Sequence, residues 1–296
     1  MTVVVAENVN VMSKSIGPAM KNKDEGPILK MAETCAENGA DYIDINLGPA
    51  RKGGPERMAW LVEIIQNHVH KPCYLDTSNA EAIEAGLKIH KNDWGRPVIN
   101  SISADPGRME LLFPLCKEYN SMAVALLYGP DGIPRDENER GELAATLQAT
   151  AAEKEIPESD LWYDPIVVPV SSQQNQVVSC TLFMSMVTAI APDAKSTCGL
   201  SNISNGSPEK LRPILNQTYL CMLRHYGLYS AILDGTDKEI LSIAKGGFPE
   251  LDDICGRTAD GEDIALDSVD EKMKPYLKTA KLLMGKSLYS DSWLDL

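Results

Sequence analysis

Eight short apolar runs recur along the chain, and each of them ends in polar or small residues. The runs cover residues 3–9, 42–48, 72–78, 97–103, 122–128, 161–168, 197–204 and 228–234. Their apolar residues are continuous rather than alternating, which is typical of strands that are buried on both faces of a sheet. We therefore predict eight short, buried strands.

The segments between these runs have the periodicity of amphipathic helices. In the first of them, Ile28, Leu29, Ala32, Cys35 and Ala36 share one helical face. A regular alternation of strand and helix predicts a parallel sheet with right-handed crossovers. Eight such units in roughly 250 residues fit a closed barrel better than an open sheet, and the first run lacks the glycine-rich phosphate loop of an open sheet. The predicted fold class is α/β, a (β/α)8 TIM barrel.

Residues 246–271 interrupt this rhythm with an acidic stretch that is rich in Gly and Asp. It contains no D-x-[DN]-x-[DN]-G calcium loop, so we interpret it as a solvated insertion before a last helix within residues 272–285. The expected organisation is a single barrel domain over residues 1–296, with the acidic insertion near 246–271.

Composition narrows the possible partners. The net charge of −14 and the absence of a basic run disfavour nucleic acid and anionic membrane surfaces as partners. The chain shows neither a signal peptide nor an apolar stretch long enough to span a membrane. Seven scattered cysteines without a CxxC pair indicate a reducing, cytoplasmic location rather than a disulfide framework.

The active site of such a barrel lies where its strands end. Polar residues at the predicted strand ends are Glu7, Asn8, Asn10, Asp44, Asn46, Asp76, Asn100, Ser103, Asp164, Ser201, Asn202, Ser204, Asn205 and Asp234. The set has no His for a metal site and no Lys for a Schiff base, so we expect neither chemistry. The base nearest to the GLSNISNG segment in the sequence is Lys210, which gives little support for a phosphate site.

Carboxylates and carboxamides suit a flat heterocycle whose edge alternates hydrogen-bond donors and acceptors. A 2-amino-4-oxopterin has such an edge, and a carboxylate can accept two hydrogen bonds from it. A single polar residue at a strand end is as often a helix cap or a loop anchor. Polar residues that end five or six successive strands favour the ligand-binding interpretation.

At these positions the chain resembles the pterin-binding methyltransferases, a family that includes methyltetrahydrofolate–corrinoid/iron–sulfur protein methyltransferases. The matching segments are AENVN at 6–10, DYIDINLGPA at 41–50, LDTSNAEAIEAGL at 75–87, VINSIS at 98–103, IPRDENER at 133–140, YDPIVVP at 163–169, GLSNIS at 199–204 and LNQTYL at 215–220. They occur in order and span nearly the whole predicted barrel.

The resemblance implies roles for particular residues. Those implied to bind the pterin are Asp76, Asn100, Asp164, Asn202, Glu7, Asn10, Asp44, Ser103 and Asn205. The first three would hold the pyrimidine edge, and Asn202 would be the catalytic amide that hydrogen-bonds near N5. Asn205 departs from the family pattern, because relatives have the longer Gln at this position.

The resemblance also implies an enzyme that moves a methyl group between the cobalt of a corrinoid and N5 of tetrahydrofolate. Tetrahydrofolate or 5-methyltetrahydrofolate would be the substrate, and no metal would be held by the chain. A separate corrinoid protein would carry the cobalt, since no D-x-H-x-x-G motif occurs here. The resemblance further implies a homodimer. It leaves open whether methyl flows to tetrahydrofolate in a demethylation pathway or away from it in acetyl-CoA synthesis.

Two alternatives stay open. A dihydropteroate synthase-like enzyme would need basic residues for a pyrophosphate leaving group. A non-catalytic module would bind folate or a corrinoid protein without transferring a group.

Overall fold

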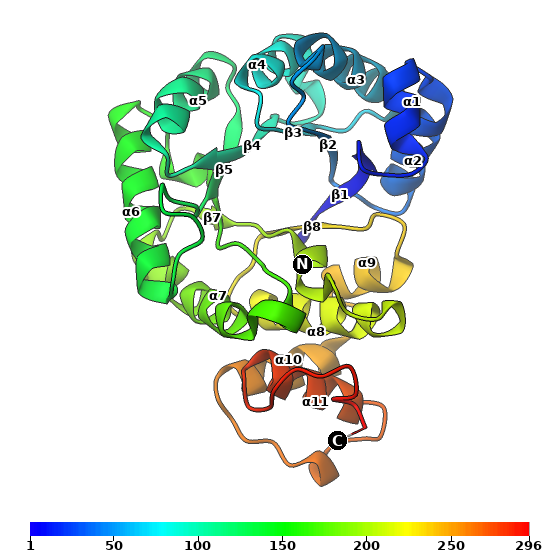
Figure 1. Cartoon of the computed structure of the whole chain (residues 1–296), viewed down its shortest axis with the longest axis vertical. Helices are drawn as coiled ribbons and strands as arrows, with labels where there is room; N and C mark the ends of the chain where they lie inside the picture. The colour runs from blue at the N-terminus through cyan, green and yellow to red at the C-terminus, as the bar shows by residue number, and fades with distance from the viewer. Residues whose placement is uncertain (296) are drawn as a thin grey trace.

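Eight parallel strands form the ring at the centre of the computed structural model, which describes residues 1–295 (Figure 1). The strands are β1 (Val3–Asn10), β2 (Tyr42–Gly48), β3 (Cys73–Thr77), β4 (Val98–Ser103), β5 (Met122–Leu126), β6 (Leu161–Asp164), β7 (Lys195–Ser196) and β8 (Ser230–Leu233). They pair in the order β7-β6-β5-β4-β3-β2-β1-β8. A parallel bridge between Gly199 and Ile232 joins the two ends, and the Ile232 N–H donates to the Cys198 carbonyl at 2.8 Å. The predicted TIM barrel is confirmed.

The helices of the chain surround this ring, except for the last two. They are α1 (Ile16–Asn22), α2 (Glu25–Glu37), α3 (Gly54–Val69), α4 (Ala80–Ile89), α5 (Pro106–Glu118), α6 (Glu137–Glu153), α7 (Val170–Ile190), α8 (Arg212–His225), α9 (Lys238–Ala244), α10 (Pro249–Ala259) and α11 (Lys274–Leu283). Short 3-10 turns are η1 (Asn92–Trp94), η2 (Glu158–Asp160), η3 (Leu200–Ser204), η4 (Glu209–Leu211) and η5 (Leu266–Ser268). Within residues 1–295, every helix is too short or too polar to cross a membrane.

The interior of the barrel changes from apolar to polar along the strands. One cluster of buried side chains includes Val5, Tyr74, Val98, Val124, Trp162 and Ile232. Two residues further along these strands, or just beyond them, come Glu7, Asp76, Asn100, Leu126, Asp164 and Asp234. Because side chains alternate between the two faces of a strand, residues two apart face the same side. The apolar cluster therefore fills the barrel toward the N-terminal ends of the strands. The next layer, toward the mouth at their C-terminal ends, consists of four acids, one amide and Leu126.

The seventh strand differs from its prediction over residues 197–204. The strand is only Lys195–Ser196, and the GLSNIS segment turns into η3 instead of continuing the sheet. Ser and Asn side chains compete for backbone hydrogen bonds and favour turns over strands. Lys195 begins β7 far from the mouth, and its Nζ lies 4.6 Å from the ring centroid of Tyr229.

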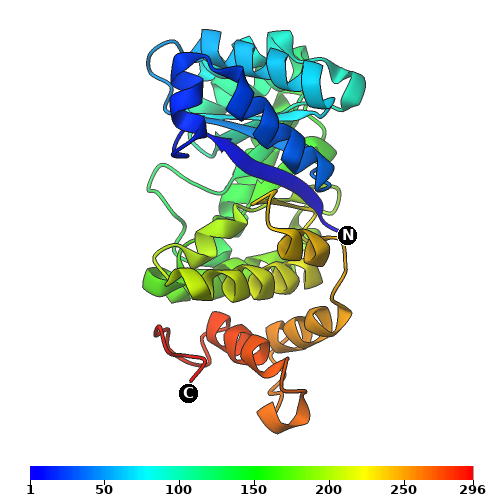
Figure 2. The ribbon, with the colours of Figure 1, turned by 90° about the vertical axis from the view of Figure 1, so that its right-hand side faces the viewer.

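The C-terminal segment forms a helical layer outside α8. Figures 1 and 2 both show α10 and α11 beyond that helix, away from the strands. Our interpretation of residues 246–271 as a solvated insertion is wrong for its first half, because α10 buries Leu251, Ile254 and Cys255. The hydrophobic face of this acidic helix explains the error. The last helix, predicted within 272–285, is confirmed as α11.

Candidate active site

Two pairs of side chains connect β2, β3 and β4 at the barrel mouth. The Asn46 Nδ2 donates to Asp76 Oδ2 at 2.5 Å, and the Asn100 Nδ2 donates to Asp44 Oδ1 at 3.4 Å. The strand register explains the grouping, because Asp76 pairs directly with both Asn46 and Asn100. Carboxylates and carboxamides thus alternate across three neighbouring strands.

These acids lie in an environment that favours their protonated forms. Burial raises the pKa of Asp44 well above its ordinary value, and the charge of nearby Asp76 raises it further. Burial likewise raises the pKa of Asp76 to about 7, although the hydrogen bond from Asn46 and the charge of Arg108 oppose the shift. Near neutral pH the pair therefore retains a proton, and the mouth offers donors as well as acceptors.

Asp164 ends β6 in a second buried carboxyl site. Its Oδ1 accepts from the Ile166 N–H at 2.8 Å, and burial raises its pKa to about 6. Ile166 has a φ of 65°, which is rare and strained for a β-branched residue. The fully buried Arg140 supports this turn by donating from Nε to the Pro165 carbonyl at 2.8 Å. The surrounding structure thus holds a strained turn beside the carboxyl group.

Asn202 lies on η3, on the opposite side of the mouth from β3 and β4 in the strand order. The Asn205 Nδ2 donates to Asn202 Oδ1 at 3.2 Å. The preceding residue, Ser201, donates from Oγ to Glu7 Oε1 on β1 at 2.5 Å. Burial raises the pKa of Glu7, while this hydrogen bond opposes the shift. Glu7 and Asn202 are therefore connected through one intervening residue.

Two arginines at the mouth were missed by sequence reasoning. Arg108 on α5 donates to the carbonyls of Thr77, Ser78 and Ser101, and so ties the ends of β3 and β4 together. Arg212 donates from Nε to Ser204 Oγ at 3.2 Å, so a basic side chain two residues beyond Lys210 contacts η3 directly. Both arginines are on helices that follow their strands, where a strand-end search does not look.

Some predicted residues have local roles. Asn10 Oδ1 accepts from the Met12 N–H at 2.8 Å, which anchors the loop after β1. Asn8 donates to Asp234 at 2.7 Å and joins the ends of β1 and β8. Ser103 ends β4 and makes no side-chain hydrogen bond within residues 1–295. The structure thus brings Glu7, Asp44, Asp76 and Asn100 together, and does not link Asn10 or Ser103 to them by hydrogen bonds.

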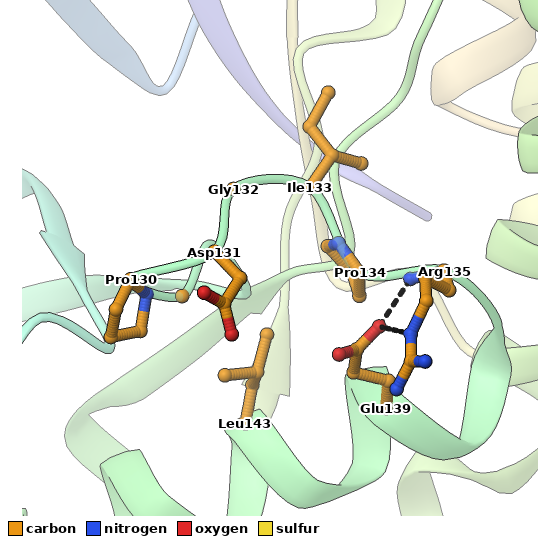
Figure 3. A pocket seen from close by; sticks show the side chains of 9 residues that line it. Pro130, Asp131, Gly132, Ile133, Pro134, Arg135, Glu139 and Leu143 are labelled. Carbon is orange, nitrogen blue, oxygen red and sulfur yellow. Dashed lines mark hydrogen bonds and ion pairs between the residues drawn. The ribbon is translucent and has the colours of Figure 1, made fainter.

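A separate hollow of about 380 Å³ lies under the loop between β5 and α6 (Figure 3). Its lining residues are Gly129, Pro130, Asp131, Gly132, Ile133, Pro134, Arg135, Glu139 and Leu143. The Arg135 Nε donates to Glu139 Oε2 at 3.2 Å along one side of it. None of the predicted site residues lines this hollow. Within residues 1–295, no group of three or more His, Cys, Asp or Glu side chains is arranged to hold a metal ion.

A family described as pterin binding enzyme matches residues 6–233, which run from β1 to the end of β8. The chain belongs to the pterin-binding enzyme family. The matched region contains the acids and amides described above except Asp234, which lies one residue beyond it. The resemblance noted from the sequence is therefore confirmed.

Two curated proteins of similar sequence have names that describe their activity. The chain is 27% identical over 241 residues to a protein named methylcorrinoid:tetrahydrofolate methyltransferase from Eubacterium limosum, covering 81% of this chain and 87% of that one. It is also 27% identical over 243 residues to methionine synthase of Mycobacterium tuberculosis, covering 78% of this chain. The chain spans only 20% of that longer protein.

Solved structures share the fold. Dihydropteroate synthase from Xanthomonas albilineans, in complex with 7,8-dihydropteroate, superposes with a TM-score of 0.63 at 16% identity. The match covers 84% of this chain and 93% of that one. The enzyme from Yersinia pestis gives a TM-score of 0.64, also at 16% identity. At this identity the likeness shows the barrel fold alone.

Proposed function

We propose that this pterin-binding enzyme transfers a methyl group from the cobalt of a methylated corrinoid protein to N5 of tetrahydrofolate. The observation that carries the proposal is the row of acids and amides across β2, β3 and β4, centred on Asp76 and Asn100. The match to the Eubacterium limosum relative covers most of both chains. The name of that relative supports methyl as the transferred group and supports transfer from a corrinoid to tetrahydrofolate.

The mouth of the barrel suits the pyrimidine edge of a pterin. The amino group and ring N–H of the pterin are donors, and the Asp76 and Asp164 carboxylates can accept from them. Asn100 can donate and accept at the same edge. Both acids have raised pKa values, about 7 for Asp76 and about 6 for Asp164. Hydrogen bonds from the pterin would stabilise the two carboxylates and so lower these pKa values.

Asn202 is proposed to act at N5. Tetrahydrofolate carries a hydrogen on N5, so accepting a methyl group makes this nitrogen a cation, which then releases its proton to water. The corrinoid, when bound, supplies a methyl carbon that leaves its bonding electrons on cobalt. A neutral amide stabilises the changing charge on N5 without binding the proton itself. We expect Asn202→Ala to lower kcat far more than tetrahydrofolate affinity, whereas equal losses in both would argue against this role.

The wider setting follows from the same proposal. We propose a separate corrinoid protein as the partner, a homodimer as the assembled state, and a cytoplasmic location. All seven cysteines lie within residues 1–295 and are free, which supports a reducing compartment. The packing of α10 and α11 on α8 supports the proposal that the chain is a single domain.

The test uses purified protein, tetrahydrofolate and methylcobalamin as a soluble substitute for the corrinoid protein, under anaerobic conditions. We expect reduced cobalamin to form spectroscopically, in proportion to enzyme and only when tetrahydrofolate is present. A parallel assay offers a dihydropterin pyrophosphate and aminobenzoate. Formation of dihydropteroate in that assay, without methyl transfer in the first, would replace the proposal with a dihydropteroate synthase activity.

A further inference from the structure

We propose that Glu7 is a positioning residue which, through Ser201, holds the turn that carries Asn202 at the barrel mouth. The inference rests on the proposed function and extends it. The resemblance placed Glu7 among the pterin-binding residues, but in the structure its Oε1 accepts from the Ser201 hydroxyl. Through this contact Glu7 acts on the turn.

The turn has little support from the sheet. β7 is two residues long, and the segment that follows it joins β8 by a single bridge at Gly199. At the two ends of η3 the backbone bonds are long, at 3.3 Å from the Asn202 N–H to the Gly199 carbonyl and 3.2 Å from the Asn205 N–H to the Asn202 carbonyl. The segment thus depends on side-chain contacts for its position.

Glu7 supplies a strong contact of this kind. Its hydrogen bond with Ser201 is 2.5 Å long and links residues 194 positions apart. Within residues 1–295, Glu7 is the one strand residue whose side chain hydrogen-bonds to η3. A hydrogen bond to a partly buried carboxylate is about twice as strong as one between neutral groups.

Charged residues on several elements act on the Glu7 carboxylate. Asp234 beyond β8 and Asp44 on β2 repel its charge, and Arg212 on α8 attracts it. Arg212 also donates to Ser204 at the other end of η3. The turn is therefore held at one end by a carboxylate from β1 and at the other by a guanidinium from α8.

Adjacent positions in η3 explain how the contact reaches Asn202. A 3-10 helix has three residues per turn, so successive side chains point about 120° apart. Once Ser201 is fixed towards Glu7, the direction of the Asn202 side chain is fixed too. Without this contact, the amide would sample several directions and spend less time in the productive one.

The test compares Ser201→Ala, which removes the donor, with Ser201→Thr, which keeps it. For Ser201→Ala we expect kcat to fall about 10- to 100-fold, as for loss of a charge-assisted hydrogen bond, with tetrahydrofolate KM changed by less than about 3-fold. Ser201→Thr should restore kcat to within about 3-fold of wild type. Ser185→Ala, a change at an exposed serine on α7, controls for loss of a hydroxyl elsewhere. Wild-type kcat in Ser201→Ala, or equal losses in kcat and affinity, would overturn the inference.

A second measurement does not depend on activity. Hydrogen–deuterium exchange of the peptide covering residues 199–205 should be faster in Ser201→Ala and normal in Ser201→Thr. Unchanged exchange in Ser201→Ala would refute the role of the contact. If wild-type protein transfers no methyl group, the proposed function fails, and exchange then reports separately on whether Glu7 and Ser201 hold the turn.

Discussion

Replacing Asp164 with Asn should make the protein more stable and a poorer pterin binder. The carboxyl group is buried, with 9% of the residue exposed, and burial raises its pKa from 3.8 to about 6. Asn keeps an oxygen that can accept from the Ile166 N–H. The change therefore removes the ionisable group and preserves the turn.

The size of the effect follows from linkage. A folded-state pKa above the unfolded value means that folding favours the protonated acid, so its contribution to stability is present at low pH and is lost as pH rises through about 6. A rise from 3.8 to about 6 corresponds to a ceiling of about 3 kcal/mol. Relaxation and water entry reduce such a ceiling, so we expect Asp164→Asn to gain about 1–2 kcal/mol at pH 8.

Urea denaturation of both proteins at about pH 8 and about pH 4 measures this gain. The advantage of Asp164→Asn should be large at the higher pH and much smaller at the lower one, where wild-type Asp164 is almost fully protonated in the folded state and partly protonated in the unfolded state. Tetrahydrofolate affinity, measured by calorimetry at pH 8, should fall in the same variant. A variant that is less stable than wild type at pH 8, or a difference that is equal at both pH values, would refute the reasoning.

Three further predictions test other parts of the structure. Asp76→Asn should weaken tetrahydrofolate binding, measured by calorimetry, roughly 30- to 150-fold, or about 2–3 kcal/mol. In the wild-type protein, the affinity for tetrahydrofolate should rise as the pH increases through about 7, where Asp76 ionises. Gly235→Ala should lose about 1–3 kcal/mol of stability in urea denaturation, since its new Cβ would lie 2.7 Å from the Ala6 Cβ and 2.8 Å from the Cys35 Sγ. Leu251 is fully buried on α10, so Leu251→Ala should lower the free energy of unfolding by about 2–5 kcal/mol and lower the temperature of a single thermal transition. A separate, earlier transition would show that α10 does not unfold together with the barrel.

Most of the barrel was predictable because its strands are buried on both faces and read as continuous apolar runs. The seventh strand was not, because Gly199 to Ser204 combine apolar residues with Ser and Asn, and pattern alone does not separate such a strand from a 3-10 turn. The hydrophobic face of α10 was hidden in the same way by the acidic residues around it.

The candidate site could be predicted only in part for a related reason. Strand-end residues such as Asp76 and Asn100 converge because parallel strands end at the same edge. The donors that support them come from helices, and contacts such as that of Arg108 with Thr77 depend on helix position rather than on sequence spacing. Likewise, Arg212 rather than Lys210 reaches η3 because α8 begins at Arg212, after the short turn η4.

The central claim is that this chain joins a corrinoid methyl group to N5 of tetrahydrofolate. The direct measurement incubates the protein anaerobically with tetrahydrofolate and methylcobalamin that bears a trideuterated methyl group, and follows the folate by mass spectrometry. The account predicts 5-methyltetrahydrofolate with all three deuterium atoms, formed at a rate proportional to protein and strongly lowered in Asn202→Ala. Unlabelled folate at the end of the reaction, from protein that calorimetry shows to bind tetrahydrofolate, would contradict it and indicate a binding module instead.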